Sequence, residues 1–455
     1  MIKSYADALA YIYNRVNFER HMMPKYNADM LDLSRMQMLL ARLDNPHRRF
    51  PSLLIAGTKG KGSTAAMSES ILRAAGYRTG LFISPHLHSF RERIRVSGQM
   101  VSEEHLINLI NRLRPHLEAI AGLTVFEMVT ALAFVTYAEA GIDVAVLEVG
   151  LGGRLDATNV IDPVVAVITP ISYDHIQLLG DTLTLIAREK AGIIRPGALV
   201  VSSLQVPEAM TIIEEVCDER GATLVVVGDD PTWRWKLGRV TLQGQAFYIG
   251  NQAYWLPLLG THQVTNAVTA MAAVTGLCQR TGLRVSPSAV LQGLRTVEWP
   301  GRFEILSRDP YVLIDSAMNG DSAANLRRTL NDYLPGREVI LIIGATADHE
   351  YRALLKILLP LSERIILTRS RHPRAATPEK LAQTAADLGF KVTTQPDITA
   401  ALDAALAMAR PRDVVCVTGS LFCVADAREH WLRRCQLPLP PIDPVIGDMK
   451  PPTNP

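Results

Sequence analysis

The sequence predicts an α/β protein with mainly parallel sheets, divided into two domains and a tail. Apolar runs of strand length, such as VAVLEVG (144–150) and VVAVITP (164–170), alternate with helix-like stretches such as EMVTALAFVTYAEAG (127–141). Buried strands that alternate with helices are typical of a parallel sheet. The length of 455 residues exceeds that of one ordinary domain. Pro300 and Gly301 interrupt the pattern, and a second series of apolar runs follows them.

The first domain is expected to span residues 1–298. SLLIAG (52–57) predicts a buried strand, and STAAMSESILRAAG (63–76) predicts the helix that follows it. Residues 225–257 change character, because short strand-like segments alternate there with turn residues. This pattern indicates a small antiparallel β excursion inside the first domain. The helical pattern returns at residues 262–282.

The second domain is expected to span residues 299–435 and to be a smaller α/β unit. Its predicted strands are the apolar runs YVLIDS (311–316), EVILIIGA (338–345), RIILTRS (364–370) and DVVCVTGS (413–420). Residues 436–455 form a proline-rich tail, which we expect to be ordered only in part.

Composition excludes several classes of function. Hydrophobic residues make up 48% of the chain and charged residues 20%, the balance of a soluble globular protein. The net charge of +2 gives no reason to expect a nucleic-acid partner. The start has no signal-peptide layout, and no apolar run reaches the roughly 18 residues of a membrane helix. Five scattered cysteines without a CxxC pair speak against disulfides or a zinc site, so we expect a reduced, cytoplasmic setting.

A glycine-rich loop follows the first predicted strand and opens the next helix. Such a loop presents backbone N–H groups to phosphate oxygens, and the helix N-terminus adds positive potential. A flexible glycine turn with chance lysines is the plainer alternative. A phosphate loop indicates a nucleotide but does not separate kinases, ATPases and ligases. The candidate nucleotide-binding residues are Gly57, Thr58, Lys59, Gly60, Lys61, Gly62, Ser63 and Thr64.

Longer motifs follow the loop in a fixed order. They include ISPH (83–86), LEVGLGGRLDATN (147–159), REKAGI (188–193), WPGR (299–302) and VTGS (417–420). This series resembles the folylpolyglutamate synthase and dihydrofolate synthase family of the Mur-ligase superfamily, over nearly the whole chain. The resemblance implies a P-loop Mur-ligase-like central domain and a smaller Rossmann-like C-terminal domain.

The resemblance also implies a reaction. ATP phosphorylates the carboxylate of a folate or dihydropteroate, and the amine of L-glutamate then attacks the acyl-phosphate. Phosphoryl transfer depends on positioning and charge neutralisation, and two Mg²⁺ ions are expected to supply part of the latter. The expected partners are these small molecules, with no nucleic acid and no membrane, and the expected state is a monomer.

The resemblance assigns roles residue by residue. Lys61, His175 and Lys190 are implied as catalytic, and Lys190 as a carbamate that binds a second Mg²⁺. The implied metal ligands are Ser84, Glu148, His175 and the modified Lys190. Asn266, Arg302 and Asp315 are implied to hold ATP between the domains. The implied pterin-side residues are Phe126, Glu127, Leu155, Asp156 and Ala157.

Plainer readings of several of these residues stay open. Ser84 precedes a proline and reads equally as a turn residue, and a lone His175 is more often structural. Lys190 reads as a helix lysine that pairs with Glu189 or faces solvent. Phe126 reads as core packing.

Two positions depart from the family pattern. Lys59 stands where the folate enzymes usually have asparagine, and Met318 where they usually have a histidine near the transferring phosphate. Methionine has no proton to donate and no titratable group. Arg369, Arg371 and His372 are candidate replacements for that histidine.

Three functions therefore remain in competition. The first is a folate-type glutamate ligase. The second is a Mur-like amino-acid ligase that acts on a different carboxylate. The third is a weakly active paralogue that binds nucleotide. The pterin-side residues favour the first, and Met318 favours divergence.

Overall fold

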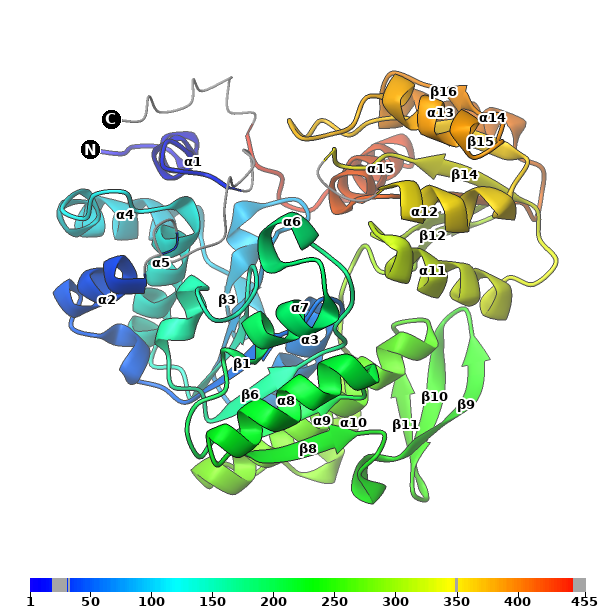
Figure 1. The fold of residues 1–455 in the computed structure, drawn as a ribbon. Coiled ribbons are helices and arrows are strands. Elements are labelled where there is room, and N and C mark those ends of the chain that lie inside the picture. Colours follow the sequence, from blue (N-terminus) through cyan, green and yellow to red (C-terminus); the bar gives the residue numbers. More distant parts are fainter. Residues whose placement is uncertain (19–30, 32, 348–350, 445–455) are drawn as a thin grey trace.

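The computed structural model describes residues 1–18, 31, 33–347 and 351–444. Its first part is built on an eight-stranded sheet in the order β4-β3-β2-β5-β1-β6-β7-β8 (Figure 1). Strands β2, β5, β1, β6, β7 and β8 run parallel, and β3 and β4 form an antiparallel edge. The strands are β1 (Ser52–Ala56), β2 (Thr79–Phe82), β3 (Ile94–Val96), β4 (Gln99–Met100), β5 (Val144–Glu148), β6 (Val165–Ile168), β7 (Leu199–Ser203) and β8 (Thr223–Val227).

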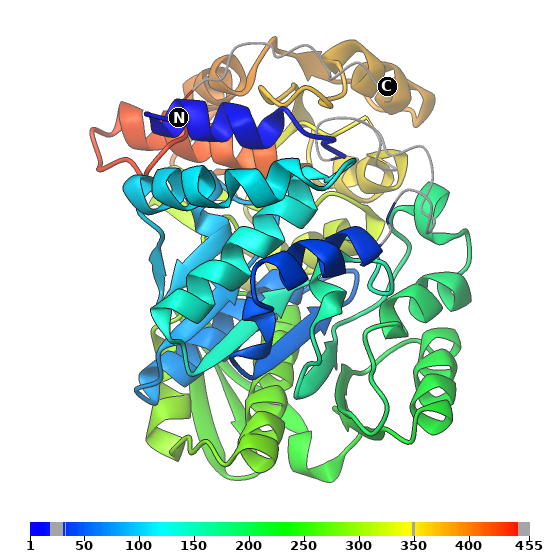
Figure 2. The ribbon, with the colours of Figure 1, turned by 90° about the vertical axis from the view of Figure 1, so that its left-hand side faces the viewer.

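Helices cover both faces of this sheet, because its strands are apolar on both sides. In β1, Leu54 and Ala56 belong to one core, whereas Leu53 and Ile55 belong to the other. The first core is closed by α1 (Tyr5–Tyr13), α2 (Leu33–Arg42), α4 (Glu103–Glu118), α5 (Val125–Ala140), α7 (Leu183–Ala191) and α8 (Pro207–Glu219). Figure 2 shows the blue and cyan members of this layer. The second core is closed by α3 (Lys61–Ala74), α9 (Thr261–Thr281) and α10 (Pro287–Arg295).

A separate antiparallel sheet of three strands lies below α11 in Figure 1. It consists of β9 (Trp235–Thr241), β10 (Gly244–Ile249) and β11 (Gln252–Leu256). The expected β excursion at 225–257 thus begins later than expected. Residues 225–227 belong to β8 of the large parallel sheet, because their β-branched run pairs with β7.

The second part is built on a six-stranded sheet in the order β12-β13-β17-β14-β15-β16, parallel except for β12. Its strands are β12 (Glu304–Arg308), β13 (Tyr311–Ile314), β14 (Val339–Ile343), β15 (Arg364–Leu367), β16 (Thr393–Thr394) and β17 (Val414–Thr418). The helices α11 (Gly320–Tyr333), α12 (Tyr351–Leu358) and α13 (Pro378–Asp387) pack on one face, and α14 (Ile398–Met408) and α15 (Leu421–Arg434) on the other.

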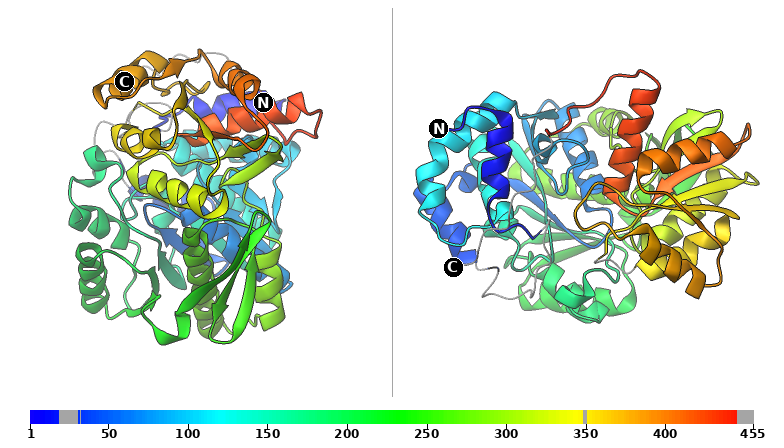
Figure 3. Two further views of the ribbon diagram at one scale, coloured as in Figure 1. Left: turned by 90° about the vertical axis from the view of Figure 1, so that its right-hand side faces the viewer. Right: turned by 90° about the horizontal axis from the view of Figure 1, so that it is seen from above.

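The carboxyl ends of parallel strands from both sheets meet at one cavity. Strands β1, β5, β13 and β17 all end toward it, and their following residues line its wall together with residues from the connecting loops. The cavity has a volume of about 1210 Å³ and lies between the two parts, which Figure 3 shows side by side. Ligands of open α/β sheets bind at this end of the strands. None of the helices in the described residues is long and apolar enough to span a membrane.

Candidate active site

The glycine-rich loop connects β1 to α3 in a conformation that needs its glycines. Gly60 has φ of 85°, and a Cβ atom there would lie 2.3 Å from Oδ1 of Asn266. The loop therefore passes directly beside Asn266 of α9, as the prediction of a shared nucleotide site requires. Thr58 is engaged within the protein, because its hydroxyl donates to the carbonyl of Ser172. Lys59, Gly60, Gly62 and Ser63 line the cavity.

Two lysines converge on one carbonyl oxygen in this loop. Nζ of Lys61 donates to the Gly57 oxygen at 3.2 Å, and Nζ of Lys190 donates to the same oxygen at 2.8 Å. Burial and the charge of Lys61 lower the pKa of Lys190 to about 7. Burial also lowers the pKa of Lys61, while the nearby Glu148 opposes that shift. The loop thus carries concentrated positive charge that an anionic ligand would relieve.

Glu148 ends β5 beside the start of α3. Its Oε2 accepts a hydrogen bond from the Ser84 amide at 3.1 Å and would lie 3.3 Å from a Cβ atom at Gly62. Burial raises its pKa, whereas Lys61, the Ser84 amide and Arg302 lower it. Two of the predicted metal ligands, Ser84 and Glu148, are therefore neighbours.

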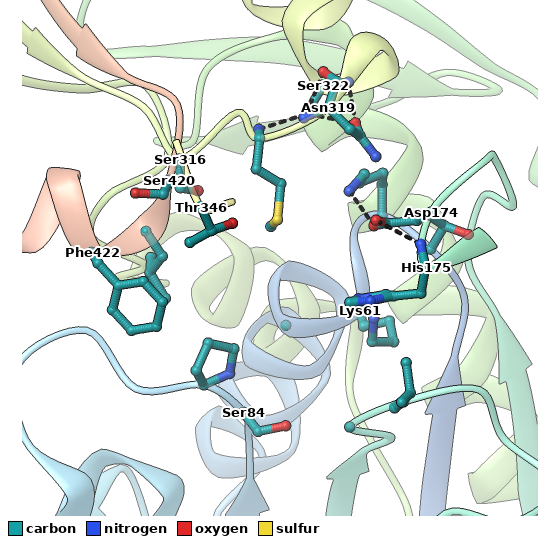
Figure 4. A pocket seen from close by; sticks show the side chains of 18 of the residues that line it. Lys61, Ser84, Asp174, His175, Ser316, Asn319, Ser322, Thr346, Ser420 and Phe422 are labelled. Atoms are coloured by element: carbon teal, nitrogen blue, oxygen red, sulfur yellow. Dashed lines mark hydrogen bonds and ion pairs between the residues drawn. The ribbon is translucent and has the colours of Figure 1, made fainter. Parts of the chain in front are cut away.

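His175 lies in the loop after β6 with a left-handed φ of 49°. Non-glycine residues adopt this conformation rarely, and it is common where a side chain is held for function. Its amide donates to Asp174, whose other carboxylate oxygen accepts from Nζ of Lys59 at 2.8 Å. Lys59 therefore ties the phosphate loop to the loop of His175 (Figure 4, where Lys61, Asp174 and His175 are labelled).

The predicted metal ligands fit a hard cation by their chemistry. A carboxylate, a hydroxyl and an imidazole line one cavity, at Glu148, Ser84 and His175, and such oxygen-rich sets suit Mg²⁺. The described residues contain no group of three His, Cys, Asp or Glu side chains arranged to hold a metal ion by themselves. Thr64 is not among the lining residues, and its buried hydroxyl has no partner among the described residues.

The second domain contributes Arg302 and Asp315 to the opposite wall. Asp315 accepts from the amides of Phe303 and Ala317, both at 2.9 Å, and so shapes the turn after β13. Burial lowers the pKa of Arg302, against the opposing effects of Asp315 and Glu148. These contacts place a cation of the second domain within the electrostatic reach of Glu148 in the first.

The predicted pterin-side residues also line the cavity, but two of them have structural duties. Asp156 accepts from the amides of Gly150, Leu151 and Thr158. Glu127 closes a capping box at the start of α5. The ring of Phe126 packs against Gly150, where a Cβ atom would lie 2.6 Å from it. The remaining lining residues of this set are Leu155 and Ala157.

Comparison with known proteins decides the family. The family model of the Mur ligase middle domain matches residues 55–274, and that of the Mur ligase glutamate ligase domain matches residues 301–421. Dihydrofolate synthase/folylpolyglutamate synthase of Bacillus subtilis is 32% identical over 94% of this chain and its own full length. The Escherichia coli protein of the same name is 36% identical over 88% of this chain and 91% of its own. The chain belongs to the dihydrofolate synthase/folylpolyglutamate synthase family.

Solved structures of the family agree with the fold. Folylpolyglutamate synthase of Mycobacterium tuberculosis, complexed with ADP and AMPPCP, has a TM-score of 0.83 at 32% identity and covers 94% of this chain and 99% of that one. FolC of E. coli in complex with DHPP and ADP has a TM-score of 0.81 at 34% identity and covers 95% and 99%. The mixed α/β architecture of a Mur ligase is thereby confirmed, and the protein is an enzyme of the ligase class.

The candidates to replace the family histidine at Met318 lie in different settings. Arg369 is exposed and is not among the residues that line the cavity. Arg371 is engaged by Asp426 at 2.7 Å and Glu429 at 2.6 Å. His372 lines the cavity and stacks on Phe422, with ring centroids 3.8 Å apart.

Sequence reasoning passed over several side chains of the cavity. Arg93 is buried, lines the wall and donates from Nε to Nδ1 of His86 at 2.9 Å. Burial lowers the pKa of His262 to about 4, so this imidazole is neutral. Arg93 lies in Phe90–Ile94 and His262 precedes Gln263 at the start of α9, and no local pattern distinguishes either residue from a core position. Ile442, in the proline-rich tail, also lines the cavity.

Proposed function

We propose that the enzyme joins L-glutamate to the carboxylate of dihydropteroate or of a folate, at the cost of ATP. The observation that carries this proposal is the cavity between the domains. Lys61, Glu148 and Arg302 line it together, and the buried Lys190 reaches the same loop from behind through the Gly57 carbonyl. Among solved relatives, the M. tuberculosis enzyme is complexed with ADP and AMPPCP, and E. coli FolC with DHPP and ADP.

Each group of side chains would have a separate task. Lys61, the loop amides and Arg302 would hold the phosphates of ATP, with Asn266 and Asp315 fixing the loops around them. Ser84, Glu148 and His175 would bind one Mg²⁺, and a carbamate on Lys190 would bind the second. Bound there, the ions would supply the neutralisation of phosphate charge that transfer needs. Phe126, Leu155 and Ala157 would bind the pterin, on loops that Asp156 and Glu127 hold in place.

The cavity also suits the intermediate. An acyl-phosphate is readily hydrolysed, and a site between two domains can exclude water when the domains close. The domain boundary at 299, a monomeric state and a cytoplasmic location remain part of this proposal.

The deciding experiment is ADP release coupled to mass spectrometry of the acceptor. The full chain is given ATP, Mg²⁺ and L-glutamate with either dihydropteroate or a reduced folate, and the expected product is heavier by one glutamyl group. Lys61→Ala is the control, and it should fold but release no ADP, because the loop loses its phosphate-binding cation. ADP release without a pteridine acceptor, or with an unrelated carboxylate alone, would assign the enzyme to another Mur-like reaction.

A further inference from the structure

The last described residues of the chain return to the first domain. Helix α15 ends at Arg434, and residues 436–443 then cross from the second domain to α1 and to the short helix η2 (Phe90–Arg93). Figure 1 and the right-hand view of Figure 3 show this red segment between the two parts. We call residues 436–443 the strap. Residues 436–439 are exposed along it.

The far end of the strap is anchored by Asp443. Its carboxylate accepts from the Tyr5 hydroxyl at 2.7 Å, the Ser89 hydroxyl at 2.9 Å and the Phe90 amide at 2.8 Å. The Asp443 amide donates to the His88 carbonyl at 3.3 Å. Three donors point at this one half-buried carboxylate. Removing the carboxylate would leave these donors without an acceptor, which costs free energy, so the contact is specific.

The anchor lies beside the part of the cavity that Tyr13 lines, toward the proposed pterin-side residues. Phe90 contacts Tyr13 edge to face, with centroids 6.0 Å apart, and Tyr13 lines the cavity. The chain after Tyr13 reaches Val16, which pairs with Thr124, the N-cap residue of α5 two positions before Phe126. Ile442, the residue before the anchor, lines the same cavity. The strap thus adds an apolar side chain to the lining of the cavity that also contains Tyr13 and Phe126.

We propose that the strap determines specificity for the carboxylate substrate, with Ile442 as a wall residue and Asp443 as its positioning residue. This inference rests on the proposed function, because it assigns the part of the cavity that Tyr13 lines to that substrate. The strap also fixes the Leu87–Phe90 segment, which carries His88 against Arg428 of α15. Substrate binding and the contact between the domains therefore share one structural element.

The test compares two truncations and two substitutions. A chain that stops after Cys435 lacks the strap, whereas a chain that stops after Pro444 keeps it and serves as the matched control. Three variants should behave alike: the truncation after Cys435, Asp443→Ala and Ile442→Ala. Each should raise KM for the pteridine substrate by about tenfold, because the loss of one wall contact changes affinity by about that factor. Each should raise KM for ATP by less than about twofold. The control should match the full chain.

A second measurement does not need turnover. Hydrogen exchange of the 84–93 segment should be faster after truncation at Cys435 and in Asp443→Ala, and unchanged in Ile442→Ala and in the control. Unchanged exchange without the strap would overturn the positioning role of Asp443. An equal rise of both KM values, or none, would overturn the specificity role. A full chain that turns over no pteridine acceptor would refute the proposed function and this specificity role with it, whereas normal full-chain turnover with insensitive variants refutes the strap alone.

Discussion

Lys190 occupies a position where an amine can lose its proton near neutral pH. With a pKa of about 7, about half of the side chain is neutral at pH 7, against about one part in three thousand for an ordinary lysine. A carbamate forms from the neutral amine and CO₂, so we expect Lys190 to be carbamylated in the active enzyme. As the pH falls through about 7, the amine gains its proton and the carbamate should be lost.

Two variants separate the carbamate from a simple lysine. Lys190→Ala and Lys190→Arg should both be nearly inactive, but a short carboxylic acid in solution should partly restore only Lys190→Ala, because arginine fills the space. Depletion of bicarbonate should lower the activity of the unmodified enzyme most strongly below pH 7. Activity that is indifferent to bicarbonate and to both substitutions would show that Lys190 is structural.

Glu148 is the predicted metal ligand with the clearest environment. Glu148→Gln keeps the shape and removes the charge, so activity should fall by about 10²–10³ and the Mg²⁺ titration should weaken markedly. The matched control is Glu69→Gln, a buried carboxylate of α3 that binds Arg73 and Thr79 and is not a lining residue of the cavity. A Mg²⁺ titration that is equal in both variants would remove Glu148 from the set of ligands.

Single residues show where sequence reasoning reaches its limit. The phosphate loop was predictable, because strand, glycines and helix are contiguous. The plain reading of Lys190, a pair with Glu189, is wrong, since Glu189 binds Arg154 at 2.8 Å and Lys190 turns inward to Gly57. Which neighbour a side chain meets depends on packing between distant segments, and no local pattern records it.

At the scale of elements, apolar runs predicted the strands well because both sheets are buried on both faces. The β excursion was placed too early, because β8 and β9 are both rich in strand-forming residues and only pairing separates them. The duties of Asp156 and Glu127 in shaping loops were also missed, since a motif does not show where its carboxylates point. These two residues position a wall of the cavity through backbone amides.

The connection from β13 to α11 carries Met318, one of the two positions expected to depart from the family pattern. Met318 lines the cavity, and its amide donates to Ser322, so the turn is held without a histidine. His372 on the facing loop is the best-placed replacement among the three candidates. Its Nδ1 accepts from the Arg374 amide, and its ring stacks on Phe422, so the side chain is held at the cavity wall.

We therefore expect His372 to compensate for Met318. His372→Ala should lower turnover by about 10²–10³, the usual cost of one lost donor in a transition state, whereas Met318→His should change little. Arg369→Ala, an exposed residue outside the cavity lining, is the control and should be inert. Steady-state rates with glutamate decide the matter, and a large gain in Met318→His would show that nothing compensates.

At the scale of the whole molecule, the strap was the least predictable feature. A proline-rich tail predicts partial order, yet Asp443 binds Tyr5, which lies 438 positions earlier in the chain. Proline composition carries no information about such a partner. A site between the domains could be predicted from the sequence, because its motifs follow predicted strands whose carboxyl ends lie at one edge of a sheet. The strap follows no strand, so no such rule predicts its position.

Each domain has its main cores to itself, so nucleotide should couple the unfolding of the two. Of the first domain, Leu87, Leu242 and Leu259 pack against the cores of the second sheet. Without ligand we still expect two calorimetric transitions. Mg²⁺ with a non-hydrolysable ATP analogue would contact Lys61 in one domain and Arg302 in the other. At a hundred times its Kd it should add about 2.7 kcal/mol to the folded state and raise both transitions.

Two variants test whether the ligand acts from both sides. In Arg302→Ala the analogue should still raise the transition of the first domain but have little effect on the second, because the contact from that wall is gone. In Lys61→Ala neither transition should move at the same ligand concentration, since the phosphates lose their main cation. If the analogue raises only the first transition in the unmodified enzyme, the nucleotide is held by the phosphate-loop domain alone. The proposed role of Arg302 and Asp315 would then have to be given up.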